Sequence, residues 1–114
     1  MTTKEVANMI KSIGIPYAYY QFPETVQSPP FICFYYAGSN DFLADDVNYA
    51  KIDRLVIELY TAEKDFTLEE KTEEALMSEG FVWTKEENYI DTEKLYEIIY
   101  ETNVVITKGE ENGE

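Results

Sequence analysis

The chain contains more apolar strand than its helices can cover. Every residue of one predicted strand, Phe31–Tyr36, is apolar, so both of its faces need shelter from water. Apolar residues also fill both faces of a long strand near the C-terminus, with Tyr96, Ile98, Tyr100, Val104 and Ile106 on one face and Leu95, Ile99 and Val105 on the other. Two short helices are predicted, and two helices cover about one face of a sheet. We therefore expect the other face to form a subunit interface rather than an exposed aromatic patch.

Local patterns divide the chain into two helices and five strands. The helices are predicted at residues 2–13, with a Thr2–Glu5 capping box, and at 66–79, capped by Asp65 or Thr67. The strands are predicted at residues 17–22, 31–36, 49–62, 81–84 and 95–107, with a long loop at 37–48 and a turn at 85–91. This order predicts the α+β class, a mostly antiparallel sheet of about four to five strands with two helices packed on one face. Residues 1–107 are expected to form a single domain, and residues 108–114 a flexible acidic tail.

The composition is strongly acidic and lacks histidine. Of 114 residues, 23 are Asp or Glu and 9 are Lys or Arg, which gives a formal net charge of −14. Such a charge repels the nucleic-acid backbone, so we expect no tight nucleic-acid binding. The absence of histidine removes the commonest metal ligand and general base. The single cysteine, Cys33, suits a reducing compartment, and no apolar run approaches the roughly 20 residues of a membrane span, so we expect a soluble protein with no membrane partner.

The acidic clusters match no catalytic or metal-binding pattern. Asp41, Asp45 and Asp46 share one loop, but their spacing differs from the calcium-loop pattern and lacks its glycine. The glutamates of the second helix, Glu69 among them, are predicted to face water. A carboxylate enzyme needs a buried acidic pair in a cleft, for which a short-looped domain of this size has little room. We therefore predict a protein that is not an enzyme, with no catalytic residue, metal or cofactor.

Tyrosines and the loop at 37–48 mark a candidate interface. Most of the ten tyrosines fall on predicted strands, where tyrosine serves sheet packing and is also enriched at protein interfaces. Long loops in compact domains are often functional or interface-forming. The candidate interface residues are Tyr35, Phe42, Leu43 and Tyr60.

Four segments of the chain resemble small tail proteins of siphophages and prophages of Gram-positive bacteria. They are MTTKEVANMIKSIGIPYAYYQFPE, PPFICFYYAGSNDFLADDVNY, IDRLVIELYTAEKDFTLEEKTEEAL and YIDTEKLYEIIYETNVVI, which together cover about residues 1–107. Their overall pattern is similar to that of the tail-terminator, or tail-to-head joining, group. This resemblance implies an α+β subunit of a ring, usually of six copies, that caps the tail tube and docks it to the head connector. It carries over no active site, and no motif separates a tail terminator from a head-completion or minor capsid protein.

The resulting expectation is a virion structural protein, made in the host cytoplasm and then incorporated into the tail. Its partners would be copies of itself in a ring, a hexamer by the resemblance, together with tail-tube and head-completion proteins. The alternative is an acidic DNA mimic that inhibits a host nucleic-acid-binding protein. Such mimics need carboxylates spaced along one surface like phosphates, whereas many of these acids fall on one helix and in two loops.

Overall fold

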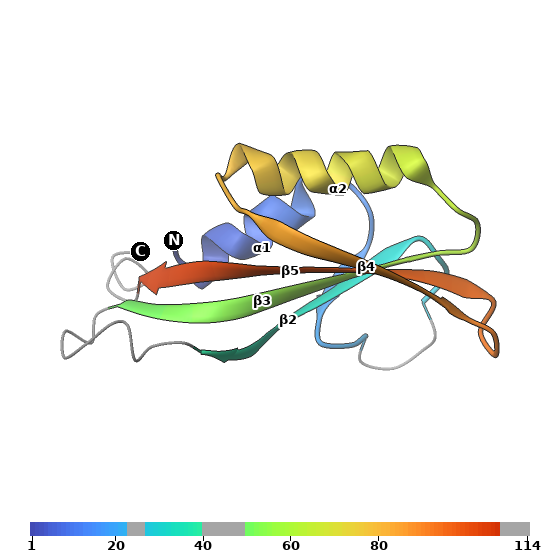
Figure 1. The fold of residues 1–114 in the computed structure, drawn as a ribbon, viewed down its shortest axis with the longest axis horizontal. Helices are drawn as coiled ribbons and strands as arrows, with labels where there is room; N and C mark the ends of the chain where they lie inside the picture. The colour runs from blue at the N-terminus through green and yellow to red at the C-terminus, as the bar shows by residue number, and fades with distance from the viewer. Residues whose placement is uncertain (23–26, 40–49, 108–114) are drawn as a thin grey trace.

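A five-stranded mixed sheet lies against two helices in the computed structural model, which describes residues 1–22, 27–39 and 50–107. The elements are α1 (Thr3–Lys11), β1 (Tyr17–Tyr19), β2 (Phe31–Ser39), β3 (Ala50–Thr61), α2 (Phe66–Ser78), β4 (Trp83–Ile90) and β5 (Leu95–Thr107). The strand order is β1-β2-β3-β5-β4, with β1 and β2 parallel and the other three pairs antiparallel. Both helices lie on the same side of the sheet (Figure 1). The predicted fold class is therefore confirmed.

The ends of both helices are set by short-range hydrogen bonds. At α1, the amide of Glu5 donates to Thr2 Oγ1 at 3.1 Å and the amide of Thr2 donates to Glu5 Oε1 at 2.9 Å, as the capping box predicts. At α2, the cap is Asp65, whose Oδ1 accepts from the amide of Leu68 at 3.0 Å. After α2 the chain turns at Gly80, which has a φ of 80° that favours glycine.

Strand β4 is longer than the sequence predicted. Residues 85–90 were expected to form a turn, but they continue the strand to Ile90 and pair with β5, and the chain reverses over residues 91–94 instead. The charged residues of this segment suit β4, because it is an edge strand whose second side has no neighbouring strand and is open to water. Conversely, β1 ends at Tyr19 and not at residue 22, because Tyr20 adopts a left-handed φ of 69°. Strand β2 extends to Ser39, and the rest of the predicted loop lies outside the described residues.

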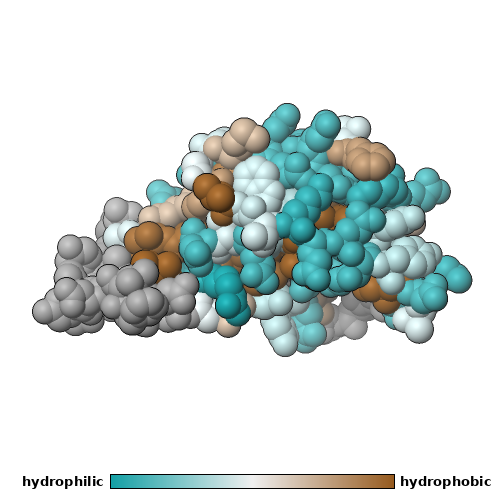
Figure 2. Space-filling view, in the orientation of Figure 1, coloured by the Kyte–Doolittle hydropathy of each residue, from teal (hydrophilic) through white to brown (hydrophobic). Residues whose placement is uncertain are grey.

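The hydrophobic core lies between the helices and the sheet. Helix α1 contributes Val6, Met9 and Ile10, Ile13 follows just after its end, and α2 contributes Leu68 and Leu76. The sheet contributes alternate residues of its central strands, among them Ile32, Phe34, Leu55, Ile57, Leu59, Ile98, Tyr100, Val104 and Ile106. The predicted alternation along β5 is thus confirmed. Figure 2 shows mostly hydrophilic residues on the side it views, with small separate hydrophobic patches. None of the described helices has the length and apolar character that a membrane crossing would require.

Candidate interaction surface

The face of the sheet away from the helices, here named the open face, mixes aromatic residues with carboxylates. The strand register places on this face Phe31, Cys33 and Tyr35 of β2, Arg54, Val56, Glu58 and Tyr60 of β3, Glu97, Ile99, Glu101 and Asn103 of β5, and Thr84, Glu86 and Asn88 of β4. No described helix covers it, as predicted (Figure 1). Its composition differs from the apolar face that the sequence predicted, since glutamates lie among the aromatic rings.

Part of the open face is covered by the chain itself. Residues 20–22, which follow β1, pack against the first half of β2. The ring of Tyr20 packs edge-on against Tyr35 with centroids 5.7 Å apart, and Phe22 packs edge-on against Phe31 at 5.6 Å. Next to these rings is a shallow depression of about 290 Å³ whose lining includes Phe22, Phe31, Tyr60 and Leu95. In the remainder of the face Glu58, Tyr60, Glu97 and Ile99 are half-buried, and the exposed residues include Thr84, Glu86, Asn88 and Glu101.

Tyr60 joins two glutamates into what we name the Tyr60 cluster (Glu58, Tyr60 and Glu97). The Tyr60 hydroxyl lies 2.9 Å from Glu58 Oε1 and 2.9 Å from Glu97 Oε2. The Tyr35 hydroxyl lies 3.4 Å from the other oxygen of Glu58, and the ring of Tyr60 stacks on Phe31 with centroids 4.9 Å apart. A phenol carries one hydrogen, so Tyr60 can donate to only one of the two carboxylates at a time. The Tyr60 oxygen and the remaining carboxylate then face each other as two acceptors, which is unfavourable unless a proton or a cation lies between them.

The electrostatics of the Tyr60 cluster disfavour two full negative charges. Burial raises the pKa of Glu58 above its usual value; the hydrogen bond from Tyr60 opposes this shift, and the nearby Glu97 carboxylate adds to it. Burial and the hydrogen bonds to Glu97 and Glu58 also raise the pKa of Tyr60, so its hydroxyl stays protonated. The described residues provide no ion pair to either glutamate.

We predict that Glu58→Gln stabilises the monomer at neutral pH by roughly 0.5–1 kcal/mol, the scale of a relieved like-charge contact between strands. A carboxyl with a raised pKa binds its proton more tightly in the folded state, so its contribution to stability falls as pH rises from the unfolded-state pKa through the folded one. Glutamine does not ionise, so the variant avoids this loss of stability at higher pH. The gain should be largest at pH 7 and shrink near pH 4.5 in urea titrations. Glu101→Gln, on the same face, is the control, and an equal gain at both pH values would contradict the prediction.

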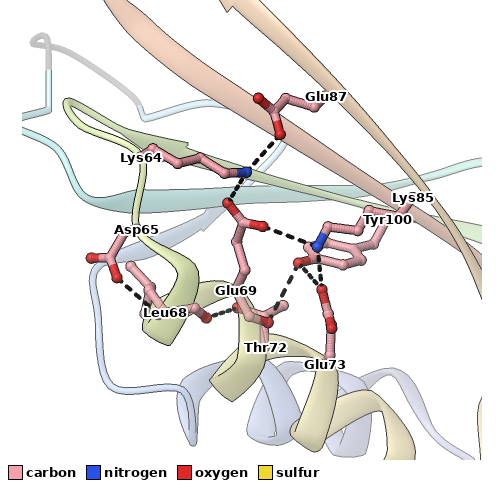
Figure 3. A network of polar contacts seen from close by, with 9 residues as sticks. All are labelled: Lys64, Asp65, Leu68, Glu69, Thr72, Glu73, Lys85, Glu87 and Tyr100. Atoms are coloured by element: carbon pink, nitrogen blue, oxygen red, sulfur yellow. Dashed lines mark hydrogen bonds and ion pairs between the residues drawn. The ribbon is translucent and has the colours of Figure 1, made fainter.

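A second polar cluster, the Glu69 network, lies on the helical side of the sheet (Figure 3). Glu69 is 2% exposed, with Lys64 Nζ 2.6 Å from its Oε2 and Lys85 Nζ 2.9 Å from its Oε1. Each lysine contacts a further glutamate at 2.6 Å, Lys64 reaching Glu87 and Lys85 reaching Glu73. The prediction that Glu69 faces water was therefore wrong, because two lysines from outside the helix allow its carboxylate to be buried. Burial opposes the charge of Glu69, but the hydrogen bonds from Lys64 and Lys85 outweigh it and hold its pKa below the usual value.

The Glu69 network joins helix α2 to the sheet. Its charges are paired, and the Tyr100 hydroxyl donates to Glu73 Oε2 at 2.9 Å, so that α2 is tied to β4 and β5. Among residues 1–22, 27–39 and 50–107, no group of three or more acidic or cysteine side chains is arranged to hold a metal ion. Asp41, Asp45 and Asp46 lie outside the described residues.

The structure brings together two of the four predicted interface residues. Tyr35 and Tyr60 both lie on the open face and flank Glu58. Phe42 and Leu43 lie outside the described residues. Sequence reasoning did not select Glu58 or Glu97 as site residues. The side-chain alternation along β3 places Glu58 on the same face as Tyr60, but the contact with Glu97 depends on the register between β3 and β5.

Comparison with models of known protein families finds no match to this chain, and comparison with curated proteins finds none either. The resemblance to tail terminators therefore stays a prediction from the sequence. The physical character of the open face is the observation on which a functional proposal can be based.

Proposed function

We propose that this chain is a non-enzymatic structural subunit of a phage or prophage virion, of the tail-terminator kind. Copies of it form a ring, a hexamer by the resemblance, that caps the tail tube and joins it to the head-completion proteins. The protein assembles in the host cytoplasm and then belongs to the virion tail. The observation that carries the proposal is the open face, a sheet surface that no described helix covers and on which Tyr35 and Tyr60 lie half-buried.

The residues of the open face support an interface role. Tyr35 and Tyr60 present large rings whose positions are held by neighbours, since Tyr20 packs on Tyr35 and Phe31 stacks on Tyr60. Aromatic side chains held in this way lose little conformational entropy on binding, and tyrosine is enriched at protein interfaces. The net charge of −14 supports a role beside DNA that passes through a channel without adhering to it.

The proposal is tested by deleting the gene from the phage or prophage that encodes it. We expect the deletion strain to produce heads and tails that are not joined, and a plasmid copy of the gene to restore infectious particles. In parallel, light scattering should measure the mass of the purified protein alone and after mixing with tail tubes from the deletion strain. We expect a ring-sized oligomer in at least the mixture.

Two results would contradict the proposal. One is a strictly monomeric protein even in the presence of tail tubes. The other is normal tails in the deletion strain together with co-purification of a host DNA-binding protein, which would favour the DNA-mimic alternative.

A further inference from the structure

We propose that the Tyr60 cluster of one copy binds a lysine from the helical side of a neighbouring copy, so that subunits associate head to tail. This inference rests on the proposed function, because it assumes that the chain forms a homo-oligomer.

The first step is the missing positive charge at the Tyr60 cluster. The Tyr60 hydroxyl lies 2.9 Å from an oxygen of each glutamate, Glu58 and Glu97, but can donate its one hydrogen to only one of them. The other side-chain donors to these carboxylates are neutral, Tyr35 to Glu58 at 3.4 Å and Asn88 to Glu97 at 3.5 Å, and neither glutamate has an ion pair within the described part of the chain. A lysine ammonium has three donors and no acceptor, so it can satisfy both carboxylates together. The shallow apolar depression beside Tyr60, lined in part by Phe31 and Leu95, has the character needed to receive the methylene stem of that lysine.

The second step is the location of the available cations. Lys64 and Lys85 are engaged in the Glu69 network. Three exposed lysines on the helices, which we name the helix patch (Lys4, Lys11 and Lys71), have no ion pair among the described residues. Residues 6–22 contain no carboxylate. Lys71 of α2 reaches the end of α1, because its Nζ lies 3.6 Å from the position that a Cβ atom on Gly14 would occupy. Glu5 lies next to Lys4, and Glu70 and Glu74 lie close to Lys71 on α2, so the helix patch supplies individual unpaired ammonium groups rather than a wholly basic surface.

The third step is the placement of these two surfaces on opposite sides of the sheet. The helices lie on one side and the open face on the other (Figure 1). The open face carries Glu58, Glu86, Glu97 and Glu101 against one basic residue among those described, Arg54, so two open faces brought together would oppose an excess of carboxylates. A head-to-tail contact instead places lysines against the Tyr60 cluster. Contacts of this kind are heterologous, and they close into rings when the rotation between subunits allows.

A charge-exchange experiment tests the contact. One variant carries Lys11→Glu and Lys71→Glu, and the other carries Glu58→Lys and Glu97→Lys. Under conditions in which the wild type forms its oligomer, with tail tubes added if they are required, we expect each variant alone to associate about tenfold more weakly or worse. We expect the two variants to assemble when mixed, because every contact in an alternating ring then pairs opposite charges. The chain with all four changes should also assemble alone.

A matched control separates this contact from a general effect of charge. Glu63→Lys changes an exposed charge in the link between β3 and α2, at a residue of neither surface, and should leave assembly unchanged. Circular dichroism checks that every variant folds. If Glu58→Lys with Glu97→Lys does not fold, the double glutamine variant replaces it, and its expected result is the same loss of association. Wild-type assembly should weaken as salt is raised, since partly exposed ion pairs are screened.

The outcomes distinguish this inference from the proposed function. A wild-type ring that is insensitive to both double variants would overturn the head-to-tail contact and leave the ring proposal standing. Loss of assembly in each variant without rescue in the mixture would also overturn it, since the two surfaces would then not meet. A wild-type chain that remains monomeric with tail tubes would remove both proposals.

Discussion

Glu69→Gln is expected to lower the free energy of unfolding by about 2 kcal/mol and the Tm by roughly 8 °C. The substitution keeps the shape of the side chain but removes the charge that Lys64 and Lys85 share. Removing one partner of a fully buried ion pair typically costs about 3–5 kcal/mol. The effect here should be smaller, because the lysine side chains are 23% and 38% exposed and each keeps a second glutamate.

The pH dependence of this loss provides an internal check. The pKa of Glu69 is lowered on folding, so its contribution to stability is present above the pKa of the unfolded chain and disappears as pH falls through the folded one. The difference between wild type and Glu69→Gln in urea titrations should therefore shrink between pH 7 and pH 3. Glu70→Gln, at the exposed neighbouring position, should stay within about 0.5 kcal/mol of wild type. A similar small loss for Glu69→Gln would show that the network contributes little.

The elements with a clear hydrophobic period were predictable from sequence. Strand β5 was predicted at residues 95–107 and is found at Leu95–Thr107, because its apolar residues alternate over its whole length. Helix α1 was predictable from a regular apolar stripe and a capping box. The second half of β4 was not predictable from sequence, because Lys85, Glu86 and Glu87 have low strand propensity by themselves. What makes them a strand is the ladder with β5, which is a long-range contact.

The candidate surface shows the same division between local and long-range information. The positions of Tyr35 and Tyr60 on the open face followed from alternation within each strand. The contact of Tyr60 with both Glu58 and Glu97 required the pairing of Tyr60 with Glu97 across β3 and β5. Likewise, the burial of Glu69 depends on Lys85, which is distant in sequence. Charged residues on helices and edge strands are assigned to water by default, and only the tertiary fold shows which of them find partners.

Ile10→Ala is expected to lower the free energy of unfolding by about 3 kcal/mol, within the range of about 2–5 kcal/mol for removing a large aliphatic side chain from a core. Ile10 is fully buried in the cluster that joins α1 to the sheet. A helix of 9 residues is unstable alone in water, so α1 depends on this packing for its existence. The loss should therefore appear both in global unfolding and in the local order of the helix.

Urea titration measures the global effect, and hydrogen exchange measures the local one. We expect the amides near the C-terminal end of α1 to exchange faster in Ile10→Ala than in wild type, beyond what the global destabilisation explains. Asn8→Ala, at an exposed position of the same helix, is the control and should be neutral or slightly stabilising, since alanine has the higher helix propensity. A loss below about 1 kcal/mol with unchanged exchange would mean that α1 is not part of the cooperative core. In that case the helix patch would lack the rigid base that the proposed head-to-tail contact requires.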